Sequence, residues 1–233
     1  ARTAGKNLGV TIEWNGAQTE SDITRQVQIV DSMIARHLDG IAVAVSERKA
    51  LVPVLDRAAA AGIPVAVFDS GLDSENYLTF ISTNNYEGGR AGGRRLAELL
   101  NGHGKVGLLL HAPGSLSTMD RERGFEDILR EQYPHIEIVA RQYGMADRAK
   151  AVASAENILT AHPDLDGFFA SSEPSASGIS LALAARGLGG KVKFVAFDAN
   201  ESMVADMRRD VISATVVQDP YRMGYEAVKA LVD

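Results

Sequence analysis

The sequence contains no cysteine among its 233 residues. Disulfide bonds, thiol catalysis and cysteine-ligated metal sites are therefore excluded. No apolar run approaches the roughly 20 residues that a membrane-spanning helix needs. Positive charge is not in excess, since the net charge is -6 and no basic stripe is present. These absences argue against a nucleic-acid partner and against direct membrane insertion.

The chain instead alternates short apolar runs with segments of helical periodicity. Hydrophobic content of 45% and charged content of 23% are typical of a globular protein, and the length suffices for two lobes. Strands are expected at residues 8–13, 41–45, 65–68, 77–82, 106–110, 136–141, 166–170, 192–197 and 213–217. Strands separated by helix-length segments predict βαβ units and parallel sheets, here as one architecture used twice.

Polar residues follow two of these strands directly. The strand at 65–68 ends on Asp69 and Ser70, and the strand at 77–82 ends just before Asn84 and Asn85. In open parallel α/β sheets, ligands bind at the carboxyl ends of the strands. The alternative is that Asp69 and Asn84 only start loops or cap helices, which these residue types also favour.

A search for catalytic and metal-binding motifs is mostly negative. Ser46 and Lys49 have a Ser-x-x-Lys spacing, but no companion motif accompanies them. The five histidines lack metal-ligand spacing, and most of them are expected at surfaces or turns. No phosphate-binding loop is present. Asp69 and Asp198 could form an acid–base pair, yet no nucleophile is evident. We therefore expect no enzyme, no cofactor and no metal site.

Four glycines open the helix predicted after Tyr86. They occupy positions 88, 89, 92 and 93, within the first two turns. Because glycine lowers helix stability, this density predicts a helix that packs closely against a neighbouring backbone.

Four phrases, in order along the chain, carry a resemblance to a known family. They are residues 62–69 (GIPVAVFD), 121–125 (RERGF), 195–198 (VAFD) and 217–225 (VQDPYRMGY). Together they resemble the periplasmic sugar-binding proteins of ABC importers, of the ribose-binding-like type. The resemblance covers nearly the whole chain.

This resemblance implies an α/β fold of two Rossmann-like lobes joined by a hinge, the type 1 periplasmic binding protein fold. Lobe 1 would hold residues 1–83 and 220–233, and lobe 2 residues 84–219. A monosaccharide or sugar alcohol would be captured between them and delivered to an ABC permease. The ligand-binding residues implied are Asp69, Ser70, Asn85, Arg121, Ser172, Asp198 and Gln218.

The sequence also departs from the family pattern. Residues 1–6 resemble the end of the family's first helix, so the first strand is expected to be missing, as are the strands after the last helix. Ser70 stands where an arginine often follows the first aspartate, Ala146 where an aromatic residue is common, and Ser172 where an asparagine is common. The shorter, uncharged Ser70 leads us to expect that pentitols, or sugars other than ribose, bind at least as tightly as ribose.

The resemblance further implies a monomer located in the periplasm, or an extracytoplasmic lipoprotein, that meets the membrane only through its permease. An alternative is the effector-binding domain of a LacI-type transcription regulator, which shares the fold and the Arg-x-x-Gly-Phe pattern. From the residues alone, carboxylates and an arginine suit a polyol, because carboxylates accept several hydrogen bonds and arginine donates in a fixed fork. Replacing Asp69 or Arg121 by alanine is expected to weaken ligand binding and leave the melting temperature nearly unchanged.

Overall fold

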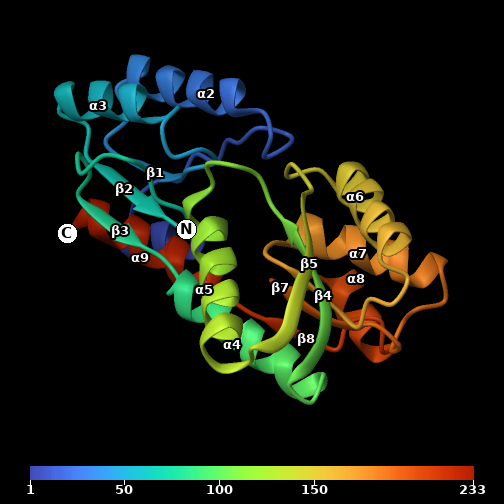
Figure 1. Ribbon diagram of the computed structural model, residues 1–233. Helices are drawn as coiled ribbons and strands as arrows, with labels where there is room; N and C mark the ends of the chain where they lie inside the picture. The colour runs from blue at the N-terminus through green and yellow to red at the C-terminus, as the bar shows by residue number, and fades with distance from the viewer. The chain divides into compact units, whose positions relative to one another are not determined.

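A computed structural model describes all residues from 1 to 233, and the chain forms two compact units (Figure 1). Unit 1 comprises Ala1–Thr83, Gly114–Ser117 and Asp219–Asp233. Unit 2 comprises Asn84–Pro113 and Thr118–Gln218. The chain thus passes from one unit to the other after Thr83 and after Gln218. Residues 114–117 belong to unit 1, whereas the predicted lobe 2 spans residues 84–219 and includes them.

Unit 1 is a three-stranded parallel sheet covered by helices. Its elements are α1 (Arg2–Leu8), α2 (Ile23–Ala35), β1 (Ile41–Ala44), α3 (Val52–Ala60), β2 (Val65–Phe68), β3 (Thr79–Ile81) and α9 (Pro220–Val232). The strand order is β1-β2-β3, with both pairs parallel. Helices α2 and α3 lie over one face of this sheet, and α9 lies along the other (Figure 1).

Unit 2 is a five-stranded parallel sheet with helices on both faces. Its elements are α4 (Asn85–Leu99), β4 (His103–Leu110), α5 (Leu116–Gln132, whose first two residues belong to unit 1), β5 (His135–Tyr143), α6 (Arg148–Ala161), β6 (Gly167–Ala170), α7 (Glu173–Ala185), β7 (Lys193–Phe197), α8 (Glu201–Arg208) and β8 (Ala214–Val216). The strand order is β5-β4-β6-β7-β8. The expected α/β class with parallel sheets flanked by helices is confirmed.

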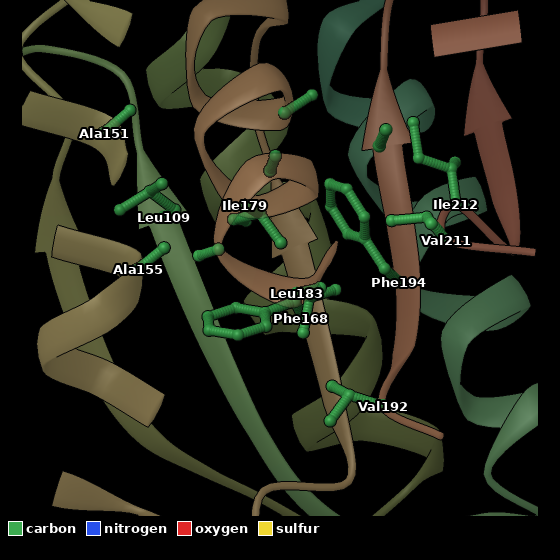
Figure 2. Packing of buried hydrophobic residues seen from close by; sticks show 14 of the residues in the cluster. Leu109, Ala151, Ala155, Phe168, Ile179, Leu183, Val192, Phe194, Val211 and Ile212 are labelled. Carbon is green, nitrogen blue, oxygen red and sulfur yellow. The ribbon is translucent and has the colours of Figure 1, made fainter. Parts of the chain in front are cut away.

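The core of unit 2 lies on both sides of its sheet. Figure 2 shows the side on which α6 and α7 pack, where Leu109, Phe168 and Phe194 of the strands meet Ile179 and Leu183 of α7. Each of these side chains is almost fully buried. Continuous apolar strands such as β6, with all four residues buried, are typical of parallel sheets covered on both faces.

The glycines of α4 allow two helices to touch backbone to backbone, as predicted. A Cβ added to Gly89 would lie 1.9 Å from the carbonyl oxygen of Arg121. Reciprocally, a Cβ on Gly124 of α5 would lie 2.0 Å from the carbonyl oxygen of Tyr86. Because neither position carries a side chain, the backbones of α4 and α5 can approach closely. Side chains near the N-terminal ends of the two helices can therefore contact one another.

One predicted strand is wrong. Residues 8–13 form the end of α1 and an irregular segment, because Gly9 adopts a left-handed conformation (φ 71°) that terminates the helix. The segment that follows is mostly exposed, with Trp14 71% accessible, so it offers no buried face to a sheet. The other eight predicted strands are present, with boundaries shifted by up to three residues.

Asn84 is a helix cap, which is the alternative that the sequence analysis left open for this residue. Asp22 accepts a hydrogen bond from the backbone of Arg25, and Asn84 accepts one from the backbone of Glu87, so both residues are N-caps. None of the helices combines the length and the apolar character that crossing a membrane requires.

Candidate ligand-binding site

The two aspartates that end strands have the same local geometry in the two units. Asp69 follows β2 with φ 63°, and Asp198 follows β7 with φ 70°. The backbone N–H of each donates to the last residue of the neighbouring strand, Ile81 at 2.9 Å and Val216 at 2.8 Å. A left-handed conformation is unfavourable for a residue with a side chain, and such strain concentrates at functional sites. Both units therefore turn an aspartate sharply at the carboxyl edge of the sheet.

The carboxylate of Asp198 is held by groups from two directions. Gln218 donates to its Oδ1 at 2.6 Å, and the backbone N–H of Glu173, at the first turn of α7, donates to its Oδ2 at 3.1 Å. Its side chain remains 26% exposed. A carboxylate has about four acceptor positions, so Asp198 keeps capacity to accept hydrogen bonds from a ligand.

Arg121 is a buried cation whose position is fixed on several sides. It is 3% exposed, and its Nε donates to Oδ1 of Asn85 at 2.8 Å while its Nη1 donates to the carbonyl of Ser171 at 2.9 Å. The guanidinium lies over the ring of Phe197, with Cζ 3.9 Å from the ring centroid, and Nη1 lies 3.8 Å from Oδ2 of Asp198. This combination of ion pair, cation–π contact and hydrogen bonds compensates the loss of hydration.

The close approach of α4 and α5 explains how Asn85 and Arg121 come within hydrogen-bonding distance. Asn85 is the first residue of α4 and Arg121 lies in the second turn of α5. The contact at Gly89 and Gly124 sets these helix ends at hydrogen-bonding distance. The structure therefore joins four of the predicted residues, Asn85, Arg121, Asp198 and Gln218, in one hydrogen-bonded and ion-paired group.

Ser172 is not bonded to that group directly but lies beside it. It precedes Glu173, whose backbone N–H binds Asp198. The hydroxyl of Ser172, 4% exposed, lies 2.8 Å from Nδ1 of His111 and 3.3 Å from the hydroxyl of Ser175. The predicted residues of unit 2 thus form one network plus one adjacent hydroxyl.

Asp69 and Ser70 belong to unit 1. Ser70 is 3% exposed, and its hydroxyl accepts a 3.3 Å hydrogen bond from the backbone N–H of Ser117. Ser115 and Ser117 are also buried, at 6% each, in the short segment that joins this unit. The hydrogen bond between Ser117 and Ser70 was not predicted, because residues 114–117 lie far along the chain from Ser70.

Sequence reasoning also missed a buried polar cluster behind the site of unit 2. His111, predicted at a surface or turn, is 6% exposed. Glu122 accepts hydrogen bonds at its Oε1 from the hydroxyl of Ser171 at 2.7 Å and from the backbone N–H of His111 at 3.1 Å. Burial raises the pKa of the Glu122 carboxyl above its ordinary value. His111 directly follows β4, so the rule that singled out Asp69 and Asp198 could have found it.

The contacts of Arg121 argue against the expectation that alanine at this position leaves the melting temperature nearly unchanged. Removing this side chain would delete the hydrogen bonds that Oδ1 of Asn85 and the carbonyl of Ser171 accept from it, and would uncover the face of the Phe197 ring. Unsatisfied buried acceptors cost about 1–3 kcal/mol each.

The chemistry of the site is that of recognition by hydrogen bonds. In unit 2, Arg121 donates to Asn85 and Ser171, the carboxylate of Asp198 accepts, and Gln218 and the backbone of Glu173 orient that carboxylate. The structure holds no cluster of three or more histidine and acidic side chains in metal-binding geometry.

Comparison with known proteins decides the family. A profile described as the periplasmic binding protein domain matches residues 1–233. The chain belongs to this family. The recognition made from four phrases of sequence is therefore confirmed, including its ribose-binding-like type.

Relatives and solved structures agree with this assignment. The chain is 29% identical over 215 residues to a ribose import binding protein from Bacillus subtilis, covering 92% of this chain and 68% of that protein. It is 30% identical over 210 residues to a D-ribose/D-allose-binding protein from Pseudomonas aeruginosa, covering 88% of this chain and 65% of the relative.

The fold matches a crystal structure of a carbohydrate transporter solute-binding protein from Agrobacterium radiobacter in complex with D-arabinose. The TM-score is 0.95 at 34% identity, covering 99% of this chain and 80% of that one. These relatives are binding proteins of sugar transport, which confirms the prediction of a solute-binding and non-enzymatic function.

Proposed function

We propose that this protein captures a monosaccharide or sugar alcohol and delivers it, as a monomer outside the cytoplasm, to the permease of an ABC importer. The observation that carries the proposal is the group formed by Arg121 and Asp198. A buried guanidinium lies 3.8 Å from a partly exposed carboxylate that is already oriented by Gln218 and by the start of α7.

The polarity of this group suits a polyol. A sugar hydroxyl both donates and accepts, so it can donate to Asp198 and accept from an arginine at the same time. Hydrogen bonds to charged groups contribute about 1.5–3 kcal/mol each. Three or four of them, less the cost of association, reach a micromolar dissociation constant, equivalent to about -8 kcal/mol.

Preorganisation supports the same proposal. Both oxygens of Asp198 are oriented by hydrogen bonds within the protein before any ligand arrives, and Arg121 is fixed by Asn85 and Ser171. Little side-chain freedom remains to be lost on binding, which favours affinity. The strained turn at Asp69 in unit 1 presents a second carboxylate of the same kind. We propose that the ligand-binding residues are Asp69, Ser70, Asn85, Arg121, Ser172, Asp198 and Gln218.

Isothermal titration calorimetry tests the proposal. The panel is D-ribose, D-allose, D-arabinose and the pentitol xylitol, with an amino acid and a dipeptide as controls. We expect micromolar or tighter binding of at least one sugar or polyol and unchanged ligand after prolonged incubation. Heat from the amino acid or the dipeptide alone would overturn the proposal.

A further inference from the structure

A chain of hydrogen bonds runs through the buried cluster behind Ser172. Nδ1 of His111 lies 2.8 Å from the hydroxyl of Ser172, which lies 3.3 Å from the hydroxyl of Ser175. Ser175 in turn donates to the carbonyl oxygen of Leu110 at 3.3 Å. His111, Ser172 and Ser175 are between 1% and 6% exposed, so water does not compete strongly for these bonds.

The carbonyl at the end of this series of hydrogen bonds determines which group donates in each of them. The carbonyl of Leu110 only accepts, and it also receives the backbone N–H of Gly144 at 2.8 Å. The hydroxyl of Ser175 therefore donates its only hydrogen to the carbonyl oxygen of Leu110. The hydroxyl of Ser172 in turn donates to the hydroxyl of Ser175. The hydroxyl of Ser172 then has no proton left for His111. Nδ1 of His111 is consequently the donor and carries a proton.

His111 is held in place by its backbone as well. Its N–H donates to the buried carboxylate of Glu122 at 3.1 Å, and its carbonyl accepts from the N–H of Ala146 at 3.2 Å. Met145 and Ala146 both adopt left-handed conformations, with φ 57° and 54°. Two consecutive strained residues without glycine indicate a turn whose geometry is maintained by its surroundings.

We propose that His111 is a positioning residue that makes Ser172 a hydrogen-bond acceptor toward the ligand, and that Glu122 fixes His111 for this task. This inference rests on the proposed function of the site. With its proton committed to Ser175 and one lone pair occupied by His111, Ser172 offers only its second lone pair. A freely rotating serine would donate as well as accept. The site therefore requires a donating hydroxyl at this point and rejects an ether oxygen or a deoxy carbon.

Variants of His111 separate positioning from packing. The side-chain amide of asparagine can replace Nδ1 as a donor, whereas glutamine extends past that position. His111→Asn should keep affinity for the tightest-binding panel member within about threefold, and His111→Gln should weaken it by about fivefold or more. Ser172→Ala should weaken binding similarly, and the double variant His111→Gln/Ser172→Ala should bind no more weakly than Ser172→Ala alone. His135→Gln, at the exposed start of β5, is the matched control and should leave affinity unchanged.

Additive losses in the double variant, or full affinity in Ser172→Ala, would overturn the proposal. A second measurement needs no ligand: long-range 1H–15N NMR of the imidazole rings in the unliganded protein, with His111 signals assigned by their loss in His111→Asn. We expect Nδ1 of His111 to carry a proton, as the hydrogen-bond directions require. A ring protonated at Nε2 alone would overturn the hydrogen-bond chain whatever the protein binds. Failure of every sugar to bind would overturn the proposed function. The ring measurement would then still test the direction of the hydrogen bonds from His111 to Leu110.

Discussion

Arg121 donates a 2.8 Å hydrogen bond from its Nε to Oδ1 of Asn85, across two helices that touch through glycine. The bond lies at the N-terminal ends of α4 and α5, where both side chains are almost fully buried. Asn85 thereby fixes the plane of the guanidinium, and this plane faces the ring of Phe197. The position of the Arg121 guanidinium, which we propose binds the ligand, therefore depends on a backbone contact one turn away.

Gly89→Ala tests this dependence. The added Cβ would lie 1.9 Å from the carbonyl oxygen of Arg121, so α5 must move away from α4. We expect a loss of about 3 kcal/mol in the free energy of unfolding and weaker sugar binding in the folded fraction. Urea denaturation measures the first and calorimetry the second. Gly16→Ala is the control, because nothing lies within 4 Å of its Cβ, and equal stability of the two variants would contradict the account.

Arg121→Lys keeps the charge but should lose function. A lysine carries its three donors on one nitrogen, so it does not reproduce the separate Nε and Nη1 donors that Arg121 directs at Asn85 and at the carbonyl of Ser171. It also lacks the flat surface that covers Phe197. We expect at least about tenfold weaker binding and about 1–3 kcal/mol lower stability. Wild-type affinity in this variant would show that the guanidinium geometry is not what binds the ligand.

Asp198→Asn separates charge from backbone conformation. Asparagine tolerates the left-handed conformation, so the turn at φ 70° should persist. The new amide, however, can accept at only one of the two positions that now receive Gln218 and the backbone of Glu173. We expect at least about tenfold weaker binding with about 1 kcal/mol lower stability. Asp210→Asn is a matched control, since Asp210 is exposed and has φ 59°, and it should bind like the wild type.

The pKa of Glu122 predicts a pH dependence of stability. Burial raises this pKa, so the native state binds this proton more tightly than the unfolded state does. The contribution is fully present below the unfolded-state pKa of about 4.3 and is lost as the pH rises through the folded-state pKa. Relative to wild type, Glu122→Gln should therefore gain stability as the pH rises from about 4 to 7. Parallel stability curves for the two proteins over this range would contradict the prediction.

The serine at position 70 leads to a prediction of which ligand binds more tightly. Because serine replaces a fork of donors by one short hydroxyl, xylitol should bind at least as tightly as D-ribose. In the structure this hydroxyl is buried and accepts from the backbone of Ser117, so Ser70→Arg should also lower the melting temperature. Competition between xylitol and D-ribose on the wild-type protein measures the preference. A clear preference for D-ribose would remove Ser70 from the determinants of specificity.

Much of the fold followed from local patterns. Helix caps such as Asp22 and Asn84, and continuous apolar strands such as Val65–Phe68, encode their structure within a few residues. The strand predicted at residues 8–13 is wrong because this segment does not pair with a sheet. Only the tertiary structure decides whether a short apolar run pairs with a neighbouring strand.

The site was predictable where a polar residue follows a strand, as at Asp69 and Asp198. His111 also follows a strand, yet its role was missed, because a lone histidine gives no sign of its partners Ser172 and Glu122. Those partners lie on other elements, at positions that only the folded sheet brings together. The same holds for Ser70 and Ser117 in the first unit.

The most direct measurement is a crystal structure of the protein with the tightest-binding sugar or polyol of the panel. Our account predicts ligand hydroxyls within hydrogen-bonding distance of the Asp198 carboxylate and the Arg121 guanidinium, with one hydroxyl donating to Ser172. A sugar bound elsewhere, in contact with neither Arg121 nor Asp198, would contradict it.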